Sequence, residues 1–326
     1  MYNQQVVSLP SLAPDPLPSM LPLAFRVVSL TRIPVKDGHG IFNEAELFHE
    51  QASLRVCWLS SQVDVRVHKG CLVGIRWLGK PVSVQGAVRI SRLVLLERAE
   101  PSVNLFRTIP ATWVKDRTLV ARAAGLWESL SRPCQHLLNA IFWDGNRFHR
   151  FLAGPSSLSG HHSDVGGNFH HAVEVAETCL MLAMGNANVC HSVVVTAALL
   201  HDAGKADEYR LKPNSRRLTM SPRGQLVGHR HTILEWIAVA RATQRVVMPE
   251  THYLGLIHAL TAAKGAEWLG IRTPVSLEAT ILSSADRLSG QSALVEQTVP
   301  DDSGFGAYHP HLKGRPYVLP TANSVA

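Results

Sequence analysis

The sequence contains no long hydrophobic run, no CxxC pair, and no basic segment followed by a short apolar block near its start. A membrane-spanning helix needs about 18 or more consecutive apolar residues, so we expect no membrane span and no membrane partner. The start does not resemble a secretory signal. The five cysteines, an odd number, fit reduced thiols better than a disulfide framework or a cysteine zinc site. These absences predict a cytoplasmic protein.

Charge and histidine content indicate what the chain does contain. The formal net charge is +7, which favours polyanionic partners such as nucleic acid. The alternative is a mildly basic soluble protein that binds no anion. Most of the 17 histidines lie in the second half of the chain, and histidine is the commonest metal ligand among side chains. A metal site in that half is therefore our first hypothesis.

The first part of the chain predicts an arm and a small β-barrel. Dense prolines block helices, so we expect residues 1–21 to form an irregular, flexible arm. Residues 22–98 contain short runs rich in valine, isoleucine, leucine and aromatic residues, separated by glycine-containing turns. About four or five short strands in such a segment predict a small barrel.

The remainder of the chain predicts helices. Residues 99–117 are expected to form a linker, and apolar residues recur at helical spacing over 118–298. Residues 299–326 are rich in proline and glycine and are expected to form an irregular tail. The predicted fold class is therefore α+β in two domains, with a small N-terminal β-barrel followed by an all-α helical bundle.

Five positions in the helical part stand out as candidate metal ligands. They recur at intervals of 28 to 30 residues, which is about one helix and its connection. Helical bundles commonly build metal sites from one or two ligands on each helix. The positions are His171, the pair His201-Asp202, His229, His258 and Asp286.

The pair His201-Asp202 is the strongest local signal, because it follows the apolar segment 193–200. An imidazole and a carboxylate at the end of a buried helix are costly unless a cation neutralises them. Gly204 is expected to loosen the helix end, and Lys205 to stand ready for a phosphate. The alternative is a capped helix that ends in a surface His-Asp pair.

The other candidates lie at the edges of apolar helix faces. His171 lies on the rim of such a face, and His229 is preferred over His231 because Gly228 is expected to clear space beside it. Asp286 lies on the inner rim of another helix, where it needs a cation or an arginine. Taken alone, His171 is more typical of a structural residue than of a ligand.

Together, these residues resemble the His…His-Asp…Asp pattern of the HD superfamily of phosphohydrolases. Over residues 22–295 the closest resemblance is to YhaM-type 3′–5′ exoribonucleases. It implies an OB-fold over 22–98, an HD domain over 118–298, and exonuclease activity on single-stranded RNA, with DNA as the other substrate. The segments that carry it are HHSDVGGNFHH (161–171), ALLHDAGK (198–205), GQLVGH (224–229), GAEW (265–268) and ATILSSADRL (279–288).

The chain departs from the YhaM pattern at one place. The family usually carries a His-His pair before its AEW element, where this chain has Ala262 and Ala263. His258 lies one helical turn earlier on the same face and is the candidate substitute. We therefore expect one firmly held ion, and the second ion stays open. A nucleic-acid-binding protein with a degraded HD site is the non-enzymatic alternative.

A second family offers an alternative enzyme. Residues 152–177 (LAGPSSLSGHHSDVGGNFHHAVEVAE) also resemble the histidine-rich motif of MOB-H class relaxases. Those proteins likewise pair this motif with an HD motif, but an OB-like barrel does not usually precede it. A relaxase-like enzyme that nicks DNA is the resulting alternative.

The leading interpretation assigns roles to the metal ligands. A bound ion would activate water for attack on a phosphate. The expected catalytic residues are Asp202, which would bridge to any second ion, His229 as a ligand of that ion, and Lys205 as a phosphate contact. Nitrogen and oxygen ligands without thiolate suit Mn²⁺, Fe²⁺ or Co²⁺, and Zn²⁺ also fits. The YhaM resemblance implies Mn²⁺.

The OB-like domain is expected to hold single-stranded nucleic acid, with RNA favoured. Such barrels use aromatic rings and a cationic groove. Phe25 and Trp58 are weaker candidates, because their strand positions favour core packing, and Trp77 is expected to be the exposed ring. The predicted nucleic-acid-binding residues are Arg76, Trp77, Lys80, Arg89, His161 and His162.

Overall fold

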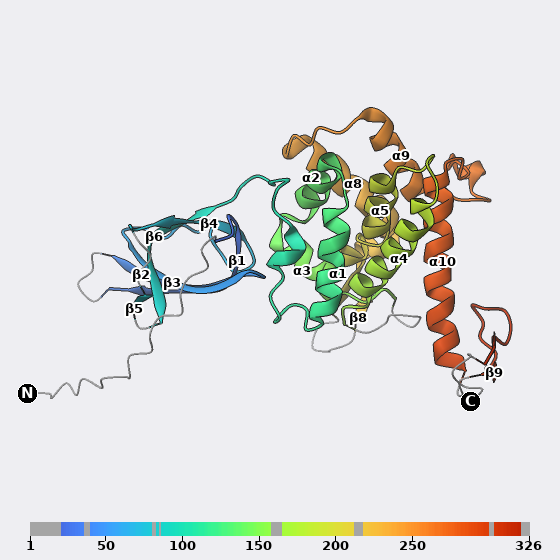
Figure 1. The fold of residues 1–326 in the computed structure, drawn as a ribbon, viewed down its shortest axis with the longest axis horizontal. Helices are drawn as coiled ribbons and strands as arrows, with labels where there is room; N and C mark the ends of the chain where they lie inside the picture. The colour runs from blue at the N-terminus through green and yellow to red at the C-terminus, as the bar shows by residue number, and fades with distance from the viewer. Residues whose placement is uncertain are drawn as a thin grey trace, which may run out of the picture. The chain divides into compact units, whose positions relative to one another are not determined.

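The protein consists of two compact units, Met1–Leu96 and Glu97–Ala326, in a computed structural model. The structure describes residues 21–35, 40–79, 83–84, 86–157, 165–211, 218–299 and 303–320. The first unit is built from strands and the second mainly from helices (Figure 1). The predicted α+β layout, with a barrel followed by helices, is confirmed.

The first unit is a closed five-stranded β-barrel. Its strands pair in the order β3-β2-β1-β4-β6, and β3 pairs in parallel with β6 at Val56 and Val88 to close the ring. The short β5 extends from β6. This arrangement is compatible with an OB-fold. The strands are β1 (Phe25–Pro34), β2 (Ile41–His49), β3 (Ala52–Ser60), β4 (Leu72–Trp77), β5 (Ser83–Val84) and β6 (Ala87–Leu95).

The core of the barrel is formed by alternate strand residues. In β2, for example, Ala45 and Leu47 are buried while their neighbours are more exposed, as the two-residue repeat of a strand requires. Phe25 is 1% exposed and belongs to this core, as its strand position favoured. Trp58 and Trp77 are half-buried and pack against the edge of the core.

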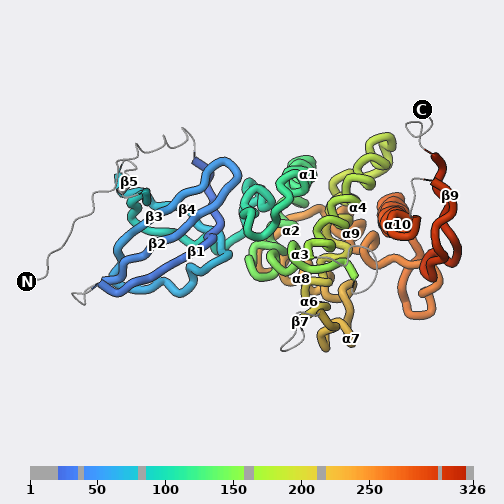
Figure 2. Tube along the Cα trace, turned by 90° about the horizontal axis from the view of Figure 1, so that it is seen from below, coloured from blue at the N-terminus to red at the C-terminus, as the bar shows by residue number. Residues whose placement is uncertain are grey.

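One apolar helix, α5, forms the centre of the second unit. All residues of α5 from Val193 to Leu200 are buried, and α4, α9 and α10 pack around it (Figure 1). Figure 2 shows α4, α9 and α10 close together from a second side. Within the described residues, no helix has both the length and the apolar character needed to cross a membrane. The α-helices are α1 (Arg117–Glu128), α2 (Arg132–Phe142), α3 (Gly145–Ala153), α4 (Gly167–Met184), α5 (His191–Leu200), α6 (Lys205–Glu208), α7 (Pro222–Leu226), α8 (Gly228–Thr243), α9 (Glu250–Thr261) and α10 (Leu277–Thr298).

Short elements connect and extend these helices. Two 3-10 helices, η1 (Leu105–Thr108) and η2 (Glu267–Leu269), precede α1 and α10, respectively. Between α6 and α7 lies a small antiparallel pair, β7 (Tyr209–Leu211) and β8 (Leu218–Met220). A second small pair, β9 (Gly304–Phe305) and β10 (Tyr317–Val318), follows α10.

The segment expected as a linker, residues 99–117, packs within the helical unit. Leu105, Phe106 and Ile109 are at most 1% exposed. The buried side-chain amide of Asn139 in α2 donates to the backbone oxygens of Glu100 and Val103, 2.7 Å away in each case. Apolar burial and these hydrogen bonds make the segment part of the helical core.

Candidate metal centre

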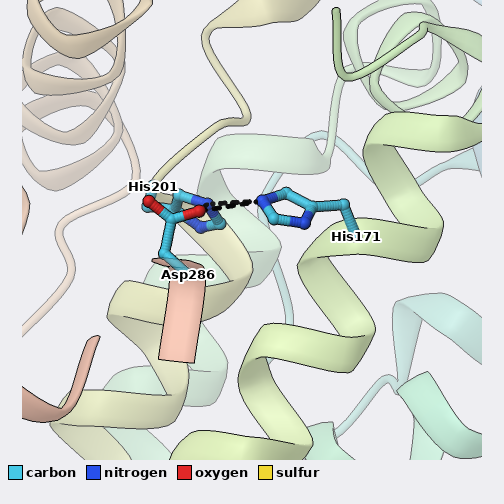
Figure 3. Close-up of side chains that lie close together, drawn as sticks. All are labelled: His171, His201 and Asp286. Carbon is cyan, nitrogen blue, oxygen red and sulfur yellow. Dashed lines mark hydrogen bonds and ion pairs between the residues drawn. The ribbon is translucent and has the colours of Figure 1, made fainter. Parts of the chain in front are cut away.

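Three side chains from three helices meet at one point. His171 lies on α4, His201 caps the end of α5, and Asp286 lies on α10. Figure 3 shows both imidazole rings and the carboxylate turned toward one another, and one ligand atom from each lies within 4.8 Å of the others. The sequence places these residues up to 115 positions apart, so the helical packing creates the cluster.

The separations fit ligands of a shared ion. His171 Nε2 lies 3.1 Å from Asp286 Oδ1 and 3.3 Å from His201 Nε2, and His201 Nε2 lies 3.7 Å from Asp286 Oδ1. Two ligand atoms that each lie about 2.1 Å from one ion are about 3.0 to 3.4 Å apart, for octahedral or tetrahedral angles. The cluster therefore needs only small adjustments to hold a divalent ion.

Asp202 completes this group, because its two carboxylate oxygens face different histidines. Its Oδ2 lies 3.7 Å from His171 Nε2 and 3.6 Å from His201 Nε2. Its Oδ1 lies 3.4 Å from His229 Nε2, at the start of α8. Asp202 is 6% exposed. Its carboxylate lies between the Nε2 atoms of His171 and His201 on one side and the Nε2 atom of His229 on the other.

Hydrogen bonds assign the tautomers of the two clustered histidines. His201 Nδ1 donates to the backbone oxygen of Ala198, 2.7 Å away, because a carbonyl can only accept. His171 Nδ1 donates to Ser289 Oγ at 3.1 Å, while that hydroxyl donates to Glu174 Oε2 at 3.2 Å. In both neutral rings the Nε2 lone pair therefore faces the carboxylates, an arrangement that requires protons or a metal ion between them.

The electrostatics of the cluster agree with a cation site. Burial by itself would raise the pKa of Asp202, but the charges of His201 and Lys205 outweigh it and hold that pKa well below its usual range. Burial would likewise raise the pKa of Asp286, but its close contacts with the rings of His171 and His201 lower it strongly. Both carboxylates are therefore ionised at neutral pH and available as ligands.

The two histidines shift in opposite directions. Burial lowers the pKa of His171 below its usual value of 6.5. Burial would also lower the pKa of His201, but the negative charges of Asp202 and Asp286 outweigh burial and raise that pKa above 6.5. Of the two rings, His201 therefore keeps its added proton to a higher pH than His171 does.

Lys205 neutralises part of the negative charge. Its Nζ lies 2.5 Å from Asp202 Oδ2 and 3.5 Å from Ser156 Oγ. The ammonium is mostly buried, with 14% of its side chain exposed. The lysine expected to stand ready for phosphate thus begins in an ion pair with a candidate metal ligand.

Two glycines position His229, although not in the way the sequence suggested. A Cβ at Gly204 would overlap the backbone of His229, so Gly204 is needed because α8 approaches it closely. Gly204 has an ordinary right-handed helical backbone and does not loosen the helix end. Gly228 has open space around it and a φ of 76°, so its role is a left-handed turn rather than clearance.

The remaining predicted site residues lie apart from this cluster or outside the described residues. The Nε2 of His258 accepts a hydrogen bond from the backbone N–H of Val275 at 3.1 Å, and the structure does not bring His258 into the cluster. Arg76 and Arg89 are exposed on the barrel, and Trp77 is half-buried there. Three predicted nucleic-acid contacts, Lys80, His161 and His162, lie outside the described residues.

Several side chains around the cluster were not foreseen. Ser289 and Glu174 hold His171, and Glu208 accepts from His229 Nδ1 at 2.7 Å. Asn168, buried at the start of α4, donates to the backbone oxygen of Asp202 at 3.2 Å. Helical spacing could have placed Glu174 and Ser289 one turn from His171 and Asp286, respectively. No local pattern pointed to Glu208.

Comparison with known families identifies an HD domain. The family model of the HD domain matches residues 168–291, which include His171, His201, Asp202 and Asp286. This match supports the HD-domain phosphohydrolase superfamily and implies a divalent metal, for which the clustered residues form a site. No curated protein and no solved structure matches the chain. The finer resemblances to YhaM-type nucleases and MOB-H relaxases stay predictions.

The close approach at Gly204 yields a stability prediction. Gly204→Ala should lower the free energy of unfolding by about 1–3 kcal/mol, because the added methyl group must displace the backbone of His229. Urea denaturation followed by circular dichroism measures this change. Gly125→Ala is the matched control, since Gly125 lies exposed in α1 with open space at its Cβ. The control should be stabilised by up to about 1 kcal/mol, and an equal response of both variants would contradict the close approach.

The raised pKa of His201 predicts that metal affinity depends on pH. The proton on this ring must leave before Nε2 can bind an ion, so affinity should rise as pH rises through the pKa of His201. Below that pKa, apparent Mn²⁺ affinity should fall by about tenfold per pH unit, since one proton is displaced per ion. Calorimetric titrations between about pH 5.5 and 8 in two buffers measure both affinity and proton release. A constant affinity across this range would contradict the assignment.

Proposed function

We propose that this protein is a metal-dependent phosphodiesterase that removes nucleotides from the 3′ end of single-stranded nucleic acid, with RNA as the favoured substrate. The observation that carries the proposal is the convergence of His171, His201, Asp202 and Asp286 within an HD domain. The polarity of digestion and the preference for RNA come from the resemblance to YhaM-type exoribonucleases.

The residues of the cluster define the chemistry. His171, His201, Asp202 and Asp286 would hold the ion. When bound, a divalent ion lowers the pKa of water and withdraws charge from a phosphate oxygen. Nitrogen and oxygen donors without thiolate suit Mn²⁺, which we propose as the physiological ion, and also Fe²⁺, Co²⁺ and Zn²⁺.

Neighbouring residues would prepare the site for a phosphate. Lys205 keeps Asp202 ionised through its ion pair and presents the positive charge nearest to that carboxylate. Rotation of the flexible lysine side chain would allow its ammonium to contact an arriving phosphate. Asn168 donates to the backbone oxygen of Asp202, and the ring of His201 donates to the backbone oxygen of Ala198. These hydrogen bonds hold both ligands, so they need little reorganisation.

The barrel offers a surface for the strand. A cavity of about 610 Å³ is lined by residues of β2, β3 and β6 and by Leu78. Phe42, Trp58 and Arg89 contribute two aromatic rings and an exposed guanidinium to its wall. Aromatic platforms beside cationic groups bind single strands of varied sequence. Trp58, the weaker tryptophan candidate, lines this cavity, whereas the predicted contact Trp77 does not. We therefore take Trp58 as the candidate stacking ring.

The enzymatic proposal is tested with purified protein, Mn²⁺ and end-labelled single strands of RNA and DNA. Wild type should release mononucleotides stepwise from the 3′ end. Asp202→Ala should lose activity by about a thousandfold or more, because the ion supplies several kcal/mol of transition-state stabilisation. Asp207→Asn, which removes the negative charge of the ion pair with Arg150, is the control and should stay active.

Other outcomes separate the alternatives. A single nick in supercoiled plasmid DNA, with protein left attached to the cut end, would favour the relaxase-like enzyme. Strand binding without cleavage under every divalent metal would overturn the enzymatic proposal and favour a binding protein with a degraded site.

The role of the barrel is tested separately, in the Asp202→Ala background, where the strand is not consumed. Trp58→Ala should weaken binding of a fluorescent single strand by about 5- to 150-fold, since stacking of one base contributes about 1–3 kcal/mol. Ile33→Ala removes an exposed apolar side chain of β1 that does not line the cavity, and should leave binding unchanged. Equal affinities for the Trp58 and Ile33 variants would exclude this cavity as the strand site.

A further inference from the structure

The imidazole of His229 lies between two carboxylates. Its Nδ1 lies 2.7 Å from Glu208 Oε2, and its Nε2 lies 3.4 Å from Asp202 Oδ1. Glu208 is 9% exposed, and its carboxyl oxygen accepts the Nδ1 hydrogen. The Nε2 lone pair of a neutral His229 therefore faces the oxygen of Asp202 that is turned away from His171 and His201.

Glu208 is held in place by close backbone packing. Its backbone oxygen accepts from Ser221 N at 2.8 Å, and a Cβ at Gly224 would overlap the backbone oxygen and the Cγ of Glu208. The hydroxyl of Ser221 caps α7 by accepting from Gly224 N at 3.0 Å. The turn that ends α6 and the start of α7 therefore fix the Glu208 carboxylate beside His229.

We propose that Glu208 is a positioning residue that makes His229 a metal ligand. By accepting from Nδ1, Glu208 fixes the tautomer and the orientation of the ring, so that Nε2 and Asp202 Oδ1 form a second cation site beside the first. A carboxylate behind a ligating histidine plays this role in many metal sites. This inference rests on the proposed function, because it assumes that Asp202 is a ligand of the first ion.

The second site offers few protein ligands. His229 Nε2 and Asp202 Oδ1 supply two donor atoms, and the structure does not bring His258 to them. Ions held by one or two side chains usually complete their coordination with water and substrate phosphate oxygens. The second ion should therefore bind more weakly than the first, and a phosphate-bearing strand should strengthen its binding.

The test is a Mn²⁺ titration of the metal-free full-length protein, in which electron paramagnetic resonance measures free Mn²⁺. Wild type should show one tight and one weak site. Glu208→Ala should weaken the weak site by about 10- to 100-fold and leave the tight site unchanged. Glu208→Gln should retain most of the weak-site affinity, because its amide oxygen can still accept from Nδ1.

Further variants separate positioning from general stability. In the His229→Ala background, Glu208→Ala should cause no additional loss at the weak site, because Glu208 acts through His229. Asp207→Asn, the neighbouring acid on α6, is the matched control and should keep both sites. Circular dichroism confirms that each variant is folded.

Each result separates this inference from the proposed function. A single Mn²⁺ site in wild type, or two unaltered sites in Glu208→Ala, overturns the role of Glu208 while leaving the phosphodiesterase proposal standing. Equal losses in the Gln and Ala variants also overturn it. Absence of both Mn²⁺ binding and cleavage in wild type overturns the proposed function itself.

Discussion

The helical unit gathers electron-rich groups in one small space, where His171 and Asp202 are buried and Asp286 is partly exposed. Lone pairs of His171 and His201 face the carboxylates of Asp202 and Asp286, with separations of 3.1 to 3.7 Å. Such groups repel one another unless a cation lies between them, and their removal from water is costly. The surrounding hydrogen bonds nevertheless hold the rings in this orientation. The arrangement therefore favours cation binding at the expense of the stability of the metal-free protein.

The apolar helix α5 makes this arrangement feasible. Because it is buried along its length, α4 and α10 can pack against it and bring ligands from both sides to its end. The close approach at Gly204 brings α8 to the same end. A rigid apolar centre thus determines where four separate segments place their polar side chains.

The sequence predicted the parts of the site that follow from periodicity and motif. The ligands His171, His201 and Asp286 belong to a series of positions spaced 28 to 30 residues apart, about one helix and its connection, so their convergence could be expected. Spacing could not show that the backbone N–H of Val275 would donate a hydrogen bond to His258 Nε2. It also could not show that the backbone of His229 would pack closely against Gly204. These are contacts between distant segments, and local patterns carry no information about them.

The last long helix illustrates what ligation would mean for folding. Of the 22 residues of α10, four are buried, namely Ala279, Leu282, Ala285 and Leu294. Its side chains Asp286 and Ser289 both bond to His171 on α4. An ion shared by α4 and α10 would link residues more than a hundred positions apart, and because the ion binds the folded site, its binding free energy would add to the free energy of unfolding. Metal supply would then set how long the C-terminal helix stays docked, as well as whether phosphate is hydrolysed.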